Sequence, residues 1–183
     1  MLRELFWYLT GEEHIRTLRE NTKIWDAWAD SEGRLETAYG RFWRRYPVPE
    51  ISLDGEVFAD ENNKWTKREE NGQLVFDQIQ YVIDTLKELK VNPNHKNGRR
   101  MIVLAWNPGN ASISKLPPCH YTFAFNVSGN KLNCHLTQRS GDIALGIPFN
   151  LACYSLLTMM IAKECGYEVG EFAHTIIDTH IYE

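Results

Sequence analysis

Residues 120–163 read HYTFAFNVSGNKLNCHLTQRSGDIALGIPFNLACYSLLTMMIAK, and this stretch decides the fold class. Apolar residues alternate with small or polar ones over 121–127 and again over 131–138, which predicts two strands. Ser128-Gly129-Asn130 between them is typical of a hairpin turn. Pro148 then opens an apolar helix that extends to about Lys163, which is shorter than the roughly 20 residues that cross a membrane. We therefore expect a hairpin that packs against a buried helix.

The first half of the chain predicts helices. Residues 1–20 form an amphipathic pattern that breaks at Gly11. Its apolar stripe consists of Leu2, Leu5, Phe6 and Leu9. Residues 73–90 predict a second helix with one buried face, because apolar residues recur there at three- and four-residue steps. Residues 50–70 are polar and irregular, so we expect a surface insertion.

Two further strands complete the pattern. Residues 101–106 form a continuous apolar run that predicts a buried strand, and residues 172–182 predict a final strand. Helices thus come first, and strands around one buried helix follow. This order indicates a single α+β domain over residues 1–183, with layered elements and outer helices.

Composition excludes several classes of protein. The 183 residues carry 20 Lys+Arg against 24 Asp+Glu, a net charge of −4, and 43% are hydrophobic. Such a chain can bury a sizeable core, which excludes disorder, and its slightly acidic balance argues against nucleic acid as the main partner. No apolar stretch is long enough to predict a membrane span, so we expect no membrane partner.

The cysteines indicate a reducing compartment. The sequence has four of them, with no CxxC pair and no signal-peptide pattern, so we expect a cytoplasmic protein without a disulfide framework. Cys134 lies on the strand face of Leu132 and Leu136 and reads as a core residue. Cys119 differs, because it follows Pro117-Pro118 in a rigid turn before a strand, where a reactive thiol is a real alternative to a structural one.

Arginines stand at the ends of two predicted strands. Arg99-Arg100 precedes one, and Arg139 with its neighbour Ser140 ends another. Guanidinium groups beside a hydroxyl suit a phosphate, which each can hold through two parallel hydrogen bonds. The competing interpretation is surface solvation or structural ion pairing.

Two other polar groups allow a binding or a structural interpretation. Asn150 falls in the first turn of the apolar helix, where its amide either caps the helix or reads the edge of a base. Asp178, His180 and Tyr182 alternate on one face of the last strand, and His174 shares that face. We favour a hydrogen-bonded pair there over a metal site, because no third ligand is visible, and we expect no metal.

Together these segments resemble the folate-dependent thymidylate synthase family, and the motifs follow the family's order. The resemblance rests on Glu4-Leu5-Phe6-Trp7, Ile24-Trp25-Asp26, Tyr39-Gly40, Arg99-Arg100, Leu116-Pro117-Pro118-Cys119-His120, Gln138-Arg139-Ser140-Gly141-Asp142, Gly146-Ile147-Pro148-Phe149-Asn150 and Asp178-Thr179-His180-Ile181-Tyr182. It implies that family's fold, a mixed sheet with a buried central helix. It also implies reductive methylation of dUMP to dTMP, in which 5,10-methylenetetrahydrofolate gives both the carbon and the hydride, so that no NAD is needed.

The resemblance also implies roles for individual residues. Cys119 would add to C6 of the uracil, with Glu4, Tyr39 and Arg139 as further catalytic groups. The dUMP site would comprise Arg99, Arg100, Gln138, Arg139, Ser140, Asp142, Asn150, His180 and Tyr182. The folate site would comprise Trp25, Asp142, Leu145 and Gly146. The protein would be a homodimer in which Arg99 and Arg100 reach the partner's site.

Alternatives within and outside the family stay open at this point. The amide of Asn150 argues for dUMP over dCMP, while Trp25 favours hydride over water as the final reactant, which weighs against a dUMP or dCMP hydroxymethylase. A non-catalytic nucleotide-binding remnant is the third alternative. We expect the domain to be incomplete at both ends, because the family's N-terminal segment and C-terminal tail do not match any part of it. Ile177 stands where many members carry Gly, so we expect an ordinary strand there.

Overall fold

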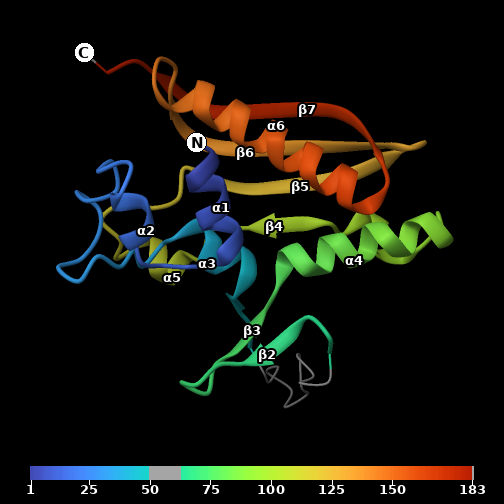
Figure 1. Ribbon diagram of the computed structural model, residues 1–183, viewed down its shortest axis with the longest axis horizontal. Coiled ribbons are helices and arrows are strands. Elements are labelled where there is room, and N and C mark those ends of the chain that lie inside the picture. Colours follow the sequence, from blue (N-terminus) through green and yellow to red (C-terminus); the bar gives the residue numbers. More distant parts are fainter. Residues whose placement is uncertain (50–62, 183) are drawn as a thin grey trace.

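A four-stranded mixed sheet, in the order β4-β5-β6-β7, is the centre of the fold in the computed structural model, which describes residues 1–49 and 63–182 (Figure 1). The chain runs α1 (Leu2–Thr10), α2 (Arg16–Arg19), α3 (Tyr39–Arg44), β1 (Tyr46–Pro47), β2 (Thr66–Arg68), β3 (Leu74–Phe76), α4 (Gln78–Val91), η1 (Lys96–Arg99), β4 (Ile102–Leu104), α5 (Pro108–Ala111), β5 (His120–Ser128), β6 (Lys131–Asp142), α6 (Gly146–Cys165) and β7 (Glu168–His180). The predicted α+β class with a mixed sheet is confirmed.

The predicted hairpin forms the middle of the sheet. β5 and β6 pair antiparallel up to Ser128 opposite Lys131, and Gly129 takes φ 61° in the turn, a left-handed conformation that glycine adopts without strain. β6 then pairs parallel with β7, so α6 serves as the crossover between them. β7 continues through Ile177 as an ordinary strand, as expected.

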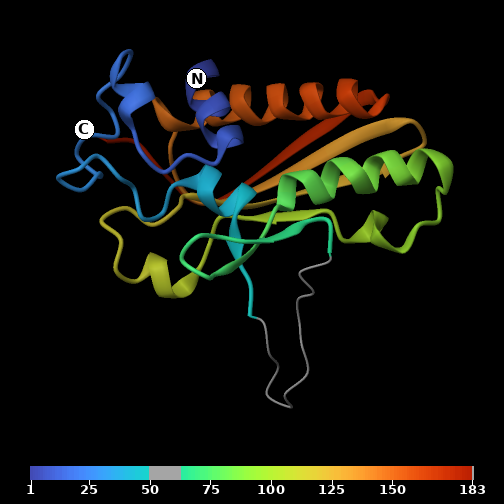
Figure 2. The ribbon, with the colours of Figure 1, turned by 60° about the horizontal axis from the view of Figure 1, so that its bottom comes forward.

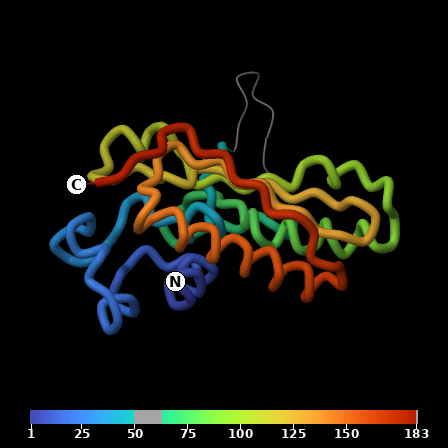
Figure 3. Tube along the Cα trace, turned by 90° about the horizontal axis from the view of Figure 1, so that it is seen from above, coloured from blue at the N-terminus to red at the C-terminus, as the bar shows by residue number. Residues whose placement is uncertain are grey.

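Helix α6 covers one face of the sheet and forms the core with it. Its Tyr154, Leu157 and Ile161 are buried against β6 and β7. Helix α4 contacts both α6 and β4, and Figure 3 shows α1, α4 and α6 on the same side of the sheet. The helix predicted from Pro148 to about Lys163 is therefore present, as Gly146–Cys165. Only its face toward the sheet is buried, because Leu151 and Met159 on its other side are 40% and 51% exposed.

The other face of the sheet carries exposed apolar side chains. Ile102 is 51% exposed, Leu104 37% and Ile177 69%. The prediction that residues 101–106 form a fully buried strand is therefore wrong for the described chain, because only Met101, Val103 and Ala105 point to the helices and are buried. A continuous apolar run here has one face in the core and one face outside it.

The buried side of α1 also differs from the prediction. Leu5, Trp7 and Tyr8 are buried, whereas Leu2 and Phe6 are both half exposed. The cause is helix α3, because Gly40 lies so close to α1 that a Cβ atom there would come within 2.3 Å of the Tyr8 carbonyl oxygen. Packing against α3 thus determines which face of α1 is buried, and the apolar stripe alone does not.

The predicted helix at 73–90 begins later than expected, at Gln78. The Asp77 carboxylate accepts a hydrogen bond from the Gln80 backbone at 3.0 Å and caps the helix, while Leu74–Phe76 form strand β3. β3 lies between β1 and β2 in a second, small sheet. Figure 2 shows this sheet on the far side of α4 from α6.

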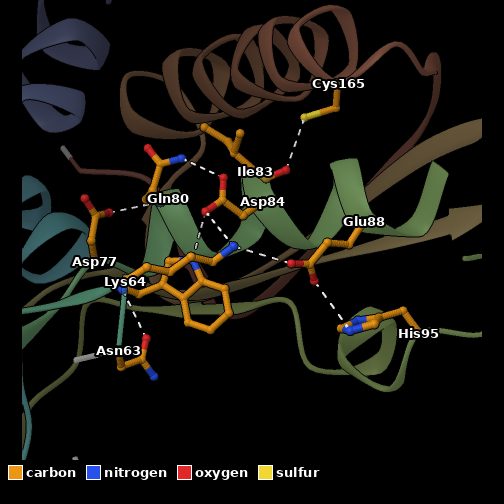
Figure 4. A network of polar contacts seen from close by, with 10 residues as sticks. Asn63, Lys64, Asp77, Gln80, Ile83, Asp84, Glu88, His95 and Cys165 are labelled. Atoms are coloured by element: carbon orange, nitrogen blue, oxygen red, sulfur yellow. Dashed lines mark hydrogen bonds and ion pairs between the residues drawn. The ribbon is translucent and has the colours of Figure 1, made fainter. Parts of the chain in front are cut away.

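The predicted insertion at 50–70 is only partly visible. Residues 50–62 lie outside the described residues, and Thr66–Arg68 form β2, which the polar pattern did not predict. Figure 4 shows how the chain joins α4 here: the Lys64 ammonium lies 3.4 Å from carboxylate oxygens of both Asp84 and Glu88. The Trp65 indole N–H also donates to Asp84 at 3.0 Å. None of the helices in residues 1–49 and 63–182 is long and apolar enough to cross a membrane.

Candidate active site

Backbone hydrogen bonds on both sides hold Cys119 in place at the start of β5. Its N–H donates to the Tyr39 hydroxyl oxygen at 2.8 Å, and its carbonyl accepts from the Arg139 backbone N–H at 2.8 Å. Tyr39 comes from α3 and Arg139 from β6, so elements distant in sequence meet at this residue. The half-buried thiol therefore has a defined position.

The Arg139 guanidinium is directed at the Cys119 turn. Its Nε donates to the Pro118 carbonyl at 3.0 Å, its Nη2 donates to the Pro117 carbonyl at 2.7 Å, and Nη2 lies 3.6 Å from the Cys119 sulfur. Burial nevertheless raises the pKa of the thiol above its ordinary value, and the positive charge of Arg139 offsets only part of that rise. The sequence analysis named Arg139 and Cys119 as catalytic groups, and the structure brings the guanidinium and the sulfur into contact. The opposing effect of burial was not part of that prediction.

His120, which follows Cys119, links that turn to the core. Its ring stacks on Tyr39 with centroids 3.7 Å apart and planes 3° apart, and its Nδ1 lies 2.6 Å from the Tyr154 hydroxyl. Burial, aided by His174, lowers the pKa of His120 to about 3, so the ring is neutral at pH 7. Burial likewise raises the pKa of Tyr39 above its ordinary value. Both groups are therefore uncharged.

The sequence pattern assigned His120 no role. The alternation of Tyr121, Phe123 and Phe125 places residue 120 on the opposite strand face, but the β5–β6 register shifts between His120 and Thr122 and turns the imidazole inward. Its position directly beside Cys119 is the one sequence signal that could have indicated it.

Glu4 and Trp25 meet at the same end of the molecule. The Trp25 indole N–H donates to the Glu4 carboxylate at 2.8 Å. The Trp25 ring lies 6.3 Å from the ring of Tyr39 and 6.2 Å from that of Trp7, measured between centroids. The structure therefore brings together Glu4, Trp25 and Tyr39, which the sequence analysis had selected separately.

Gln138 organises the polar groups next to this cluster. It is 2% exposed, and its Oε1 accepts from the Asn150 Nδ2 at 3.1 Å and lies 3.0 Å from the His174 Nε2. Its Nε2 donates to the Ser140 carbonyl at 2.8 Å. Gln138 engages one Asn150 N–H, and within residues 1–49 and 63–182 the Oδ1 and the other N–H of that amide make no hydrogen bond.

The remaining predicted folate residues lie at the end of β6, in the loop after it and at the start of α6. Asp142 is buried, and its Oδ1 accepts from the Ala144 backbone at 2.8 Å. Leu145 is exposed, and the space around Gly146 is open, since an added Cβ would have no neighbour within 4 Å. This region thus combines a backbone turn, an exposed apolar side chain at Leu145 and unoccupied space beside Gly146.

The end of β7 adjoins that loop. His180 pairs with Asp142 in the β6–β7 register, its Nδ1 lies 3.6 Å from the Asp178 carboxylate, and its ring packs edge-on against Tyr182 at 4.7 Å. In the part of the chain that the structure describes, no three His, Cys, Asp or Glu side chains gather as a metal site.

Comparison with known proteins shows to which family the chain belongs. The family model described as thymidylate synthase matches residues 1–183. The chain belongs to the thymidylate synthase family. It is also similar to a curated protein named thymidylate synthase from Haloferax volcanii, with 60% identity over 182 residues. That match covers 100% of this chain and 50% of the relative, so the chain spans about half the length of the curated relative it matches.

The family resemblance inferred from the motifs is therefore confirmed, and one group of predicted site residues lies apart from the others. Within this member of the thymidylate synthase family, Arg99 ends η1 and Arg100 follows it; both are exposed. β4 runs antiparallel to β5, with Ile102 opposite Ala124, so the arginine pair lies beyond the strand end opposite to Cys119. A single chain does not bring these arginines to the cluster around Cys119.

Proposed function

We propose that this chain carries the catalytic centre of a thymidylate synthase, which converts dUMP to dTMP. The observation that carries the proposal is the Cys119 thiol, held between Tyr39 and Arg139 with a guanidinium nitrogen 3.6 Å from its sulfur. A thiolate with a fixed position beside a cation is the nucleophile that addition to C6 of a uracil requires. The family match over the whole chain supports the same reaction.

Arg139 acts on the thiol in two ways. Its charge lowers the free energy of the thiolate, against the burial that raises the pKa of Cys119. Its bonds to the Pro117 and Pro118 carbonyls keep the turn rigid, so the sulfur stays in one attack geometry. With Ser140 beside it, the same residue also contributes to a site for the dUMP phosphate.

Asn150 supplies base recognition in this proposal. Gln138 holds one amide N–H, so the Asn150 Oδ1 accepts from the uracil N3–H and the remaining N–H donates to O4. A cytosine presents the reverse pattern of donor and acceptor at these positions. A site built around one hydrogen-bond pattern rejects the other strongly, which favours dUMP over dCMP. His180 and Tyr182 complete the nucleotide site at the ribose.

The residues that the resemblance assigns to folate fit a flat, partly apolar co-substrate. Open space at Gly146, the exposed Leu145 and the Trp25 ring provide apolar contacts, while Asp142 provides a carboxylate. When bound, 5,10-methylenetetrahydrofolate supplies the one-carbon unit and the hydride. Trp25 excludes bulk water, and Glu4, fixed by the Trp25 indole at 2.8 Å, moves protons at the base with Tyr39.

The proposal includes a homodimer in the cytoplasm. Four free cysteines fit a reducing compartment. The outer sheet face, with Ile102, Leu104 and Ile177 exposed, is an apolar surface of the kind that a second copy covers. Arg99 and Arg100 lie apart from Cys119 in one chain, and a second copy across that face would place them at the partner's site.

Covalent trapping tests the nucleophile. With 5-fluoro-dUMP and methylenetetrahydrofolate, mass spectrometry of the chain should show a covalent adduct on the peptide containing Cys119. Cys119→Ala should abolish it, whereas Cys165→Ala, a matched change at the end of α6, should retain it. An adduct that survives Cys119→Ala would overturn the assignment. The mass of the product from dUMP separates methylation from hydroxymethylation.

Subunit complementation tests the arginine pair. A Cys119→Ala chain and an Arg99→Gln/Arg100→Gln chain would each be inactive alone. If the arginines act across the interface, mixing equal amounts and allowing exchange should restore one of the two sites in each mixed dimer, and thus about a quarter of all sites. A mixture as inactive as its components would show that the arginines serve their own chain or no site.

A further inference from the structure

Four polar groups meet at the Gln138 side chain, next to the Asn150 amide that the proposed function assigns to the base. Gln138 is 2% exposed, and its Nε2 donates to the Ser140 carbonyl at 2.8 Å. Its Oε1 accepts from the Asn150 Nδ2 at 3.1 Å and lies 3.0 Å from the His174 Nε2. Strands β6 and β7 and helix α6 thus contribute to one network. Of its members, His174 is the one without a role in the proposed function.

The Ser140 carbonyl fixes the direction of the Gln138 amide. A carbonyl oxygen only accepts hydrogen bonds, so the amide directs its Nε2 toward Ser140 and its Oε1 to the other side. The space there is tight, because a Cβ atom added at Gly141 would lie 3.0 Å from the Gln138 Nε2. A buried amide oxygen needs donors as neighbours, so both groups that face Oε1 have to donate.

The tautomer of His174 follows from this requirement. Its Nε2 lies 3.0 Å from an oxygen that accepts, so Nε2 carries a hydrogen. Its Nδ1 makes no hydrogen bond within residues 1–49 and 63–182, so the contact with Gln138 alone decides which nitrogen is protonated. Burial, and to a smaller extent the neighbouring His135, lowers the pKa of His174, which keeps the ring mostly neutral at pH 7.

The same network decides which atoms Asn150 presents to a base. The Asn150 Nδ2 is turned toward Gln138, and Oδ1 lies on the other side of the amide. An amide rotated by half a turn would place a donor where the uracil N3–H requires an acceptor. That reversed pattern fits cytosine, whose N3 accepts and whose 4-amino group donates.

Rotation of Asn150 is opposed by the groups around Gln138. A rotated Asn150 would turn its Oδ1 toward Gln138, so the Gln138 amide would have to rotate as well and donate to it. The Gln138 oxygen would then face the Ser140 carbonyl oxygen, and its N–H groups would face the His174 N–H. Both hydrogen bonds would be lost inside the protein, where an unpaired polar group is costly.

We propose that His174 is a positioning residue through which the site selects uracil over cytosine. Its Nε2–H holds Gln138 in the orientation in which Asn150 accepts from the uracil N3–H and donates to O4. Since the base is the uracil of the proposed reaction, this role rests on the proposed function and deepens it. Part of the specificity thus comes from a residue of β7 that acts through Gln138 and Asn150.

Calorimetry with dUMP and dCMP compares three forms of the full chain. The unmodified chain should bind dUMP more tightly than dCMP. His174→Phe removes the N–H and keeps a ring that packs against Phe172, whose centroid lies 5.9 Å from that of His174. We expect the ratio of the two dissociation constants to fall about fivefold, the effect of one hydrogen bond. His174→Gln keeps an N–H donor and should restore most of the ratio.

The ratio separates positioning from a structural role. A structural defect weakens the binding of dUMP and dCMP alike, so an unchanged ratio in His174→Phe would overturn the proposal. An equal fall of the ratio in His174→Gln would do the same, because the packing of the ring and not its N–H would then matter. An unmodified chain that binds neither nucleotide would contradict the proposed function and this role with it, whereas dUMP binding without the expected change in ratio would contradict this role alone.

Nitrogen NMR of the ligand-free chain detects the tautomer without any substrate. The His174 ring signals, assigned by their loss in His174→Gln, should show a protonated Nε2 and an unprotonated Nδ1 above neutral pH. A hydrogen on Nδ1 in place of Nε2 would overturn this role alone, even where dUMP is bound and converted.

Discussion

At the scale of single residues, the chemistry of Cys119 is a balance between burial and one cation. Burial raises the pKa of the thiol, and Arg139 at 3.6 Å lowers it in part. We expect Arg139→Gln to raise the pKa of Cys119 further and to slow alkylation by iodoacetamide at neutral pH several-fold. The measurement is the alkylation rate against pH. Arg139→Lys keeps a cation, so its alkylation rate should lie between those of the unmodified chain and of Arg139→Gln. An alkylation profile that does not change in Arg139→Gln would contradict this balance.

His120 makes the stability of the fold dependent on pH in the acid range. Its pKa falls to about 3 in the folded chain from 6.5 in the unfolded one, so below pH 6.5 the unfolded chain binds a proton that the folded chain does not. The free energy of unfolding therefore loses nothing to His120 above pH 6.5, and it decreases as the pH falls from 6.5 toward 3. The slope is about 1.4 kcal/mol per pH unit for one proton.

Urea unfolding at several pH values measures this slope. His120→Gln removes the titrating ring, so its free energy of unfolding should depend less on pH between 6.5 and 4 than that of the unmodified chain. His135→Gln, a change at an exposed histidine, serves as the control and should keep the steep dependence. Equal slopes in both variants would rule out His120 as the source.

At the scale of elements, the close contact between α1 and α3 holds together the two helices that carry Glu4 and Tyr39. Gly40→Ala would place a methyl group 2.3 Å from the Tyr8 carbonyl, a backbone atom that cannot move alone. We expect a loss of about 2–4 kcal/mol in the free energy of unfolding, at the upper end of what overpacking costs.

The matched control for that contact is Gly109→Ala in α5. The nearest atom to a Cβ there is 3.4 Å away, an ordinary contact, so stability should change little. Thermal melts of both variants provide the measurement. A Gly40→Ala chain that melts together with the unmodified chain would show that α1 and α3 are not tightly packed.

Local sequence patterns predicted some elements well and others poorly, for a physical reason. β5, β6 and α6 each contain a long periodic run, and a period of two or of 3.6 follows from the backbone of the element itself. The start of α4 was missed because Phe76 continues the apolar period although it lies in β3. The cap at Asp77, an Asp just before the periodic run, is the sequence signal that marks the true boundary.

At the scale of the whole molecule, the exposed sheet face predicts association. Ile177→Glu would put a charge in the proposed dimer interface, so we expect sedimentation to show a monomer and dTMP formation to fall strongly, because the arginine pair would be lost from the partner's site. Val91→Glu changes an exposed apolar residue at the end of α4, away from this sheet face, and should leave both properties intact. A dimeric Ile177→Glu chain would place the interface elsewhere.

The sequence suggested which residues belong to the candidate site, an assignment that stays a prediction, but it did not suggest how they are arranged. The motifs around Cys119, Gln138 and Asn150 identified side chains able to hold a nucleotide. That Glu4 meets Trp25 at 2.8 Å, and that Gln138 holds Asn150 at 3.1 Å, depends on elements that are far apart in the chain. Such contacts leave no periodic pattern in the sequence, so the sequence shows which residue types are present and does not show that they touch.

The sequence by itself determined the strands of the hairpin and the long helix after them, because turn chemistry and apolar periodicity act between residues close in the chain. It also selected Cys119 as the candidate thiol, which stays a prediction. The tertiary structure alone decided which face of α1 and of β4 is buried, that His120 turns inward, and that the pKa of Cys119 rises despite Arg139. These properties depend on what packs against each group and how much water remains there, and packing joins residues across the whole chain.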